Sequence, residues 1–80
     1  MSRFTITNLR ALVDEANERY PRETPNYYGN LKRFCISGAY GGWQIQEHYE
    51  DTSAVRQITY GYVSARECAE QFRAYLWRNF

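Results

Sequence analysis

The segment Gly38-Ala39-Tyr40-Gly41-Gly42-Trp43 is the first place to look for chemistry, because three glycines in five positions are typical of a loop that holds a phosphate. Such a loop has to lead directly into a helix N-terminus, where free backbone N–H groups converge on the anion. Here the following residues alternate between apolar and polar side chains, which indicates a strand. Gly41 and Gly42 therefore predict a tight hairpin turn. Gly38, inside the preceding strand, indicates either a bulge or a backbone crossed by a side chain such as Trp43.

The other reactive side chains are few and scattered. His48 is the only histidine, and it lies in the acidic segment EHYED, which is more typical of a solvated surface loop than of a metal or catalytic site. Cys35 and Cys68 match neither the spacing of a metal site nor a disulfide framework, so we expect two buried, reduced thiols. We predict no metal, no cofactor and no enzymatic activity.

The composition indicates one folded domain over residues 1–80. Apolar residues make up 44% of the chain and aromatic residues 18%, which is enough for a core. Ten basic and nine acidic side chains give a formal charge of +1, so no strong field attracts a polyanion. The chain has neither a signal-peptide pattern nor an apolar run that could span a membrane, so we expect it in the cytoplasm. We expect a monomer or a homodimer.

Two helices are predicted, one near each end of the chain. The first has a buried stripe at helical spacing, with Thr7 as its predicted cap, and the two prolines of the 21–30 loop end it. Its stripe consists of Leu9, Leu12, Val13, Ala16 and Tyr20. The last helix begins with a capping box from Ser64 to Glu67. Its stripe consists of Cys68, Ala69, Phe72, Tyr75 and Leu76.

Between the helices, three segments alternate with the period of a strand. They contain Phe34 and Ile36, then Trp43 and Ile45, and finally the segment 58–62. We therefore expect an α+β fold in the order α-β-β-β-α, with a three-stranded antiparallel meander and both helices packed on one face. The residues predicted on that face are Phe34, Ile36, Ile45, Ile58 and Tyr60.

Some large side chains fall outside the predicted buried stripes. Tyr27, Tyr28 and Trp77 are such aromatic residues, and Arg73 and Arg78 lie beside Trp77 on the last helix. Exposed aromatic and arginine side chains are common hot spots of protein interfaces. These five residues are the candidate partner-binding site. An equal alternative is that Tyr27 and Tyr28 fold back as a lid over the sheet edge.

The order α-β-β-β-α, with a last helix that begins after a serine, here Ser64, resembles the double-stranded-RNA-binding domain. That family has a lysine cluster there, whereas this chain has Arg66 together with Glu67 and Glu70. The Pro-His hairpin loop of the family is replaced by residues 40–42. The resemblance implies at most weak, salt-sensitive nucleic-acid binding. The candidate residues for it are Lys32, Arg33 and Arg66.

A second resemblance involves the spacing of three segments. Leu9–Asn17, Ala39–Trp43 and Tyr60–Glu67 together resemble small uncharacterised proteins of tailed phages and prophages. Compact phage proteins of this size, anti-CRISPR proteins among them, commonly bind a host complex and block it without catalysis. The resemblance implies an inhibitor of a host protein or nucleoprotein complex that acts in the host cytoplasm. Because the charge is near neutral, the contact would use an aromatic and arginine patch.

Overall fold

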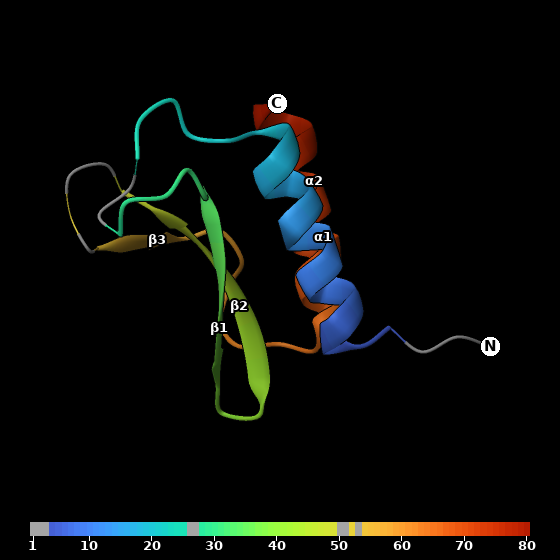
Figure 1. Ribbon diagram of the computed structural model, residues 1–80. Coiled ribbons are helices and arrows are strands. Elements are labelled where there is room, and N and C mark those ends of the chain that lie inside the picture. Colours follow the sequence, from blue (N-terminus) through green and yellow to red (C-terminus); the bar gives the residue numbers. More distant parts are fainter. Residues whose placement is uncertain (1–3, 26–27, 50–51, 53) are drawn as a thin grey trace.

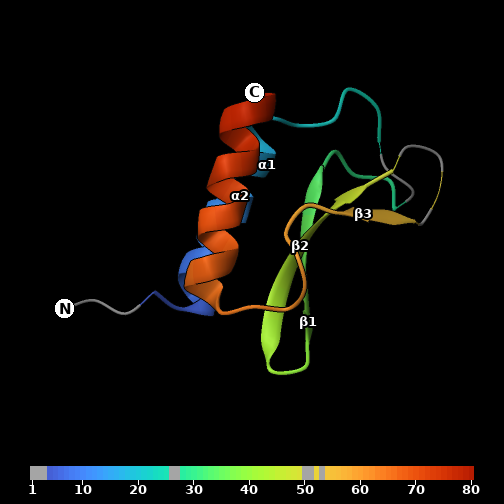
Figure 2. The same ribbon diagram turned by 180° about the vertical axis from the view of Figure 1, so that it is seen from behind.

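The computed structural model describes residues 4–25, 28–49, 52 and 54–80. Two helices, α1 (Ile6–Arg19) and α2 (Ala65–Asn79), lie side by side on one face of an antiparallel sheet (Figures 1 and 2). The sheet contains β1 (Phe34–Ala39), β2 (Gly42–His48) and β3 (Val55–Gln57), in the order β1-β2-β3. The predicted α+β fold in the order α-β-β-β-α is confirmed. In the part of the chain that is described, neither helix has the length and apolar character needed to cross a membrane.

The core lies between the two helices and the first two strands. α1 lies over β1 and α2 over β2. The Phe34 ring packs edge-on against the Phe72 ring, with 5.0 Å between the centroids and 78° between the planes. The buried apolar residues are Leu9, Val13 and Ala16 of α1, Cys68, Ala69 and Phe72 of α2, and Phe34 and Ile45 of the sheet. These residues belong to the stripes that helical and strand periodicity predict.

The two helices begin in different ways. α1 starts two residues earlier than a Thr7 cap requires, because Thr5 is its N-cap and Ile6 already packs against the core. The Asn8 Oδ1 atom accepts hydrogen bonds from the Thr5 N–H at 2.9 Å and from the Thr5 hydroxyl at 3.0 Å. α2 begins as predicted, since Ser64 Oγ accepts from the Glu67 N–H at 3.2 Å. Both caps satisfy polar groups that a helix end leaves without partners.

The predicted hairpin turn joins β1 to β2, but it is centred one residue earlier than expected. Tyr40 and Gly41 have φ angles of 52° and 73°, and Gly42 is already paired with Ala39. Two central residues with positive φ are what a tight hairpin requires. The β1–β2 register is continuous through Gly38, and a Cβ there would lie 2.7 Å from the Trp43 ring. Of the two explanations for Gly38, the crossing side chain is therefore correct.

The third strand differs from the prediction in its position. Instead of an alternating strand over residues 58–62, β3 ends at Gln57 and pairs only with the end of β2. The chain then bends and rejoins β2 at one bridge between Val63 and Trp43. It advances six residues from Gln57 to Val63, while β2 advances three from Gln46 to Trp43. The additional residues cannot stay in the ladder, so this segment bulges out of the sheet.

A buried threonine explains how the bulge is accommodated. The Thr59 side chain is fully buried, and its hydroxyl accepts a hydrogen bond from the Ile45 N–H at 3.0 Å. A side-chain oxygen thus replaces the strand carbonyl that this N–H would otherwise find. Ile58 still packs against the core, but Tyr60 is 84% exposed. The assignment of Tyr60 to the core face was therefore wrong.

Candidate functional site

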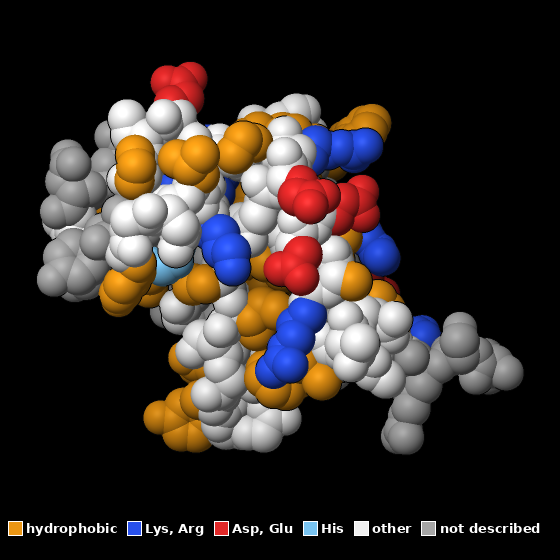
Figure 3. Space-filling view, in the orientation of Figure 1, with side chains coloured by type: hydrophobic (Ala, Val, Ile, Leu, Met, Phe, Trp, Pro, Cys, Tyr) orange, Lys and Arg blue, Asp and Glu red, His pale blue; other side chains and the backbone are white. Residues whose placement is uncertain are grey.

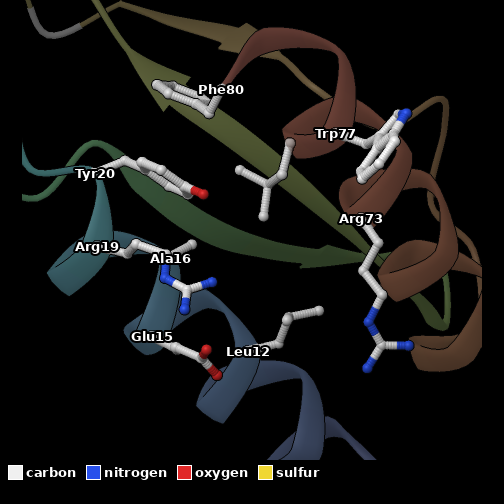
Figure 4. Close-up of a pocket in the computed structure, with 9 residues that line it drawn as sticks. Leu12, Glu15, Ala16, Arg19, Tyr20, Arg73, Trp77 and Phe80 are labelled. Carbon is white, nitrogen blue, oxygen red and sulfur yellow. The ribbon is translucent and has the colours of Figure 1, made fainter.

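A groove of about 430 Å³ lies between the C-terminal halves of α1 and α2. Figure 4 shows its side chains converging from the two helices, with the sheet behind them. The groove is lined by Leu12, Glu15, Ala16, Arg19 and Tyr20 from α1 and the residue after it, and by Arg73, Leu76, Trp77 and Phe80 from α2 and its C-cap. It is the best candidate for a functional site because it combines apolar surface with charged groups.

Helical spacing explains why these side chains meet. On α1, Leu12, Glu15 and Arg19 follow one another at i, i+3 and i+7, so they share a face next to the buried stripe. On α2, Arg73 and Trp77 are four residues apart and share a corresponding face. The half-buried side chains of Leu12 and Leu76 provide the apolar surface of the groove. The charged side chains that line the groove with them are Glu15, Arg19 and Arg73.

Trp77 is the most unusual member of the groove, because 87% of its surface is exposed. The predicted site residues Arg73 and Trp77 are therefore brought together on one surface. The Arg73 guanidinium lies 5.9 Å from the centre of the Phe4 ring, which helps to hold it beside the groove. Arg78 is exposed on the same helix but does not line the groove.

The two predicted partner-binding tyrosines, Tyr27 and Tyr28, are not among the groove residues that the structure describes. Tyr28 is 62% exposed and lies edge-on to the His48 ring, with 5.8 Å between the centroids. It is not among the groove residues. Tyr27 lies outside the described residues. The proposed aromatic patch is thus divided, and the groove carries the part with Arg73 and Trp77.

One end of the groove is closed by an aromatic stack. The Phe80 and Tyr20 rings are stacked with 4.3 Å between their centroids, and the Arg33 guanidinium lies 5.4 Å from the centre of the Phe80 ring. Arg33 also donates hydrogen bonds to the backbone carbonyls of Tyr20 at 2.9 Å and Pro21 at 3.2 Å. These contacts join the end of α2 to the end of α1.

Arg33 also takes part in a charged cluster on the sheet. Its Nη1 atom lies 3.4 Å from one carboxylate oxygen of Glu47, and Arg56 pairs with the other oxygen. Arg56 donates a second hydrogen bond to the Tyr75 hydroxyl at 2.8 Å. Burial raises the pKa of Tyr75, and the Glu47 charge raises it further. Arg33 is therefore committed to contacts inside the molecule.

The three candidate nucleic-acid residues are not brought together. Lys32 and Arg33 precede β1, whereas Arg66 is in the first turn of α2, at the opposite end of the fold (Figures 1 and 2). On the face shown in Figure 3, basic and acidic side chains are interspersed rather than arranged in a continuous basic stripe. A stripe of that kind is the electrostatic footprint expected of a nucleic-acid-binding surface.

His48 lies away from the groove, beside Arg22 and Tyr28. Its Nδ1 atom is buried and makes no hydrogen bond among the described residues. Burial lowers the pKa of His48, and the neighbouring Arg22 charge lowers it further. Arg22 is only 7% exposed and donates a hydrogen bond to the His48 carbonyl at 2.7 Å. This contact holds the chain just after α1 against the end of β2.

The cysteines are both free thiols, but their burial differs from the prediction. Cys68 is fully buried, as expected, whereas Cys35 is only half-buried. Burial raises the pKa of both thiols. Within the described ranges, no group of three or more His, Cys, Asp and Glu side chains is arranged to hold a metal ion.

Comparison with models of protein families, with curated proteins and with solved structures finds no match to this chain. The fold and the groove therefore define the protein only as a small two-layer α+β domain with an exposed tryptophan between its helices.

Several groove residues were not predicted as site residues. Leu12 and Tyr20 were assigned to the buried stripe, and Glu15, Arg19 and Phe80 were not assigned a role. Their spacing contained a signal, because Phe80 is three residues after Trp77, and Glu15 and Arg19 follow Leu12 at helical intervals. The pairing of these two helix faces depends on tertiary packing.

Proposed function

We propose that this protein is a non-catalytic inhibitor that binds a host protein or nucleoprotein complex through the α1–α2 groove, as small phage accessory proteins do. The observation that carries the proposal is the 87% exposure of Trp77 beside an apolar groove. Tryptophan is strongly enriched at the centres of protein interfaces, because its removal from water there contributes much binding energy.

The groove also indicates the chemistry of the partner surface. Half-buried Leu12 and Leu76 favour an apolar side chain in the groove. Arg19 and Arg73 favour carboxylates on either side of that side chain, because arginine forms charge-assisted, bidentate hydrogen bonds with carboxylate. Glu15 is the single acidic residue of the lining. We therefore expect the partner to present a large apolar side chain between acidic residues.

The test compares variants in binding and in inhibition. The immobilised chain is incubated with bacterial lysate, and a retained protein is purified for affinity measurements. Trp77→Ala is expected to weaken its binding by about 2 kcal/mol or more while leaving the melting temperature nearly unchanged. Arg73→Glu is expected to weaken it by repelling the acidic residues. The chain is also expected to inhibit the activity of the purified partner.

Tyr40→Asn is the matched control, because Tyr40 is 94% exposed on the hairpin turn, away from the groove. Asparagine tolerates the positive φ angle of that position. Equal weakening by Tyr40→Asn and Trp77→Ala, or binding without inhibition, would contradict the proposal. Retention of duplex RNA at about 0.2 M salt would favour the nucleic-acid-binding function instead.

A further inference from the structure

The outer edge of β1 is a second surface that the groove does not involve. β1 is one of the two edge strands of the sheet, and no described segment pairs with it on the side opposite β2. At its start, the Asn17 side chain takes the place of a neighbouring strand. The Asn17 Oδ1 atom accepts from the N–H groups of Arg33 at 3.0 Å and Phe34 at 2.8 Å, and its Nδ2 atom donates to the Phe34 carbonyl at 3.1 Å.

The contact with Asn17 shows which backbone groups of β1 point outward. In an antiparallel strand, the N–H and C=O of one residue point to the same side, and the side alternates along the chain. The backbone N–H and C=O of Phe34 bond to Asn17 and so point away from β2. The backbone groups of Ile36 and Gly38 therefore also point away from β2. The hairpin gives the same assignment, because Ala39 and Gly42 flank a two-residue turn and form a hydrogen-bonded pair. The free edge therefore offers the N–H and C=O groups of Ile36 and Gly38.

This free edge is complementary to itself. When two copies of β1 pair antiparallel with Ser37 opposite Ser37, Ile36 of each copy lies opposite Gly38 of the other. All four outward-pointing groups of each copy then find partners, which gives four hydrogen bonds across the pair. The Asn17 contact ends the free edge on one side and the Tyr40 turn ends it on the other. A longer or shifted pairing would have to displace one of them.

The charged side chains of α1 beside the β1 edge also fit a two-fold symmetric pairing. A shallow groove of about 250 Å³ separates the β1 edge from α1, and Arg10 and Asp14 stand on its α1 side. Figure 3, which looks onto α1 and β1, shows apolar surface between them with charged side chains alongside. A two-fold axis makes the two α1 helices antiparallel. Arg10 of each copy then faces Asp14 of the other, so opposite charges meet.

We propose that the protein forms a symmetric homodimer through β1, with one continuous six-stranded sheet. The β1 edge and the α1–α2 groove use different faces of α1, so dimerisation leaves both Trp77 grooves open. The dimer goes beyond the proposed inhibitor function, because it would present two identical grooves to a partner. Unpaired strand edges are templates for such pairing.

The first test is the solution mass of the full chain by sedimentation equilibrium from about 10 µM to about 1 mM. Because the contact is short, we expect a Kd on the order of 0.1 mM. Amide exchange followed by NMR gives a second readout. With rising concentration, exchange at Ile36 and Gly38 is expected to slow, while the Phe34 amide, already bonded to Asn17, stays unchanged. A monomer throughout this range, or unchanged exchange at Ile36 and Gly38, overturns the proposal.

Charge exchange tests the geometry. Arg10→Asp places like charges opposite each other across the axis and is expected to raise the Kd at least about tenfold. The double variant Arg10→Asp, Asp14→Arg restores opposite charges and is expected to return the Kd to within about threefold of the original. Failure of this rescue in a variant with an unchanged melting temperature would refute the antiparallel arrangement. A dimer lost on Trp77→Ala instead would show that the groove, rather than β1, is the contact.

Discussion

Glu47→Gln is the substitution whose consequences can be worked out most fully. The Glu47 side chain is 13% exposed, and its two oxygens pair with Arg33 and Arg56, which are 25% and 50% exposed. Glutamine keeps the shape and one acceptor but removes the charge between the two guanidinium groups. The cluster connects the end of α1, the sheet and α2, so its weakening should be felt by the whole domain.

The magnitude follows from the exposure of each pair. Exposed ion pairs contribute about 0.2–1 kcal/mol, and hydrogen bonds to a charged group reach about 1.5–3 kcal/mol when shielded from water. With one partner half-exposed, we expect a loss of about 1–2 kcal/mol in the free energy of unfolding. In a domain of this size, that lowers the melting temperature by about 4–16 °C.

The assay is thermal unfolding followed by circular dichroism, with Glu18→Gln on the exposed face of α1 as the control. The difference between Glu47→Gln and the original chain should shrink at about 1 M salt, where charges are screened within about 3 Å. The pKa of Tyr75, read from the ultraviolet absorbance of the ionised phenol, should fall, because the Glu47 charge helps to raise it. A melting temperature equal to that of Glu18→Gln, with an unchanged Tyr75 pKa, would refute this account.

Three further predictions concern the core, the sheet and pH. Phe72→Ala removes a fully buried ring and should lower the free energy of unfolding, measured by chemical denaturation, by about 3–5 kcal/mol. A melting temperature that falls by only a degree or two would contradict the place of Phe72 in the core. Gly42→Ala should cost about 1–3 kcal/mol, because its Cβ would lie 2.6 Å from the Tyr62 carbonyl carbon, and an unchanged denaturation midpoint would show that the bulge can move away. The pKa of His48 is lower in the folded chain than its usual value of about 6.5 in the unfolded chain, so the unfolded chain binds the proton first as the pH falls. The free energy of unfolding therefore decreases as the pH drops from about 6.5 toward the folded pKa, and His48 has no effect on it above about pH 6.5. His48→Phe should lose less stability than the original chain between about pH 7.5 and pH 5, and equal losses would exclude His48 as the cause.

Local patterns were sufficient for the helices and the hairpin. Leu9, Val13 and Ala16 repeat with the helical period, and Ser64 is followed at the right distance by Glu67, so both signals lie within a few residues of chain. The glycines at the hairpin likewise act on their own backbone. Such features depend on neighbours along the sequence, which explains why the element order and most of the core could be predicted.

Contacts between distant segments decided the remainder. Thr59 replaces a strand carbonyl at Ile45, which moves the third strand and exposes Tyr60, and no periodicity reports a side chain that substitutes for backbone. Arg33 was predicted as a candidate nucleic-acid residue, and packing places Glu47 beside it, which the sequence alone does not indicate. The groove and the free edge of β1 also depend on how α1 lies against α2 and β1. These surfaces are formed by residues from separate segments, so their chemistry follows from the packing of the whole chain.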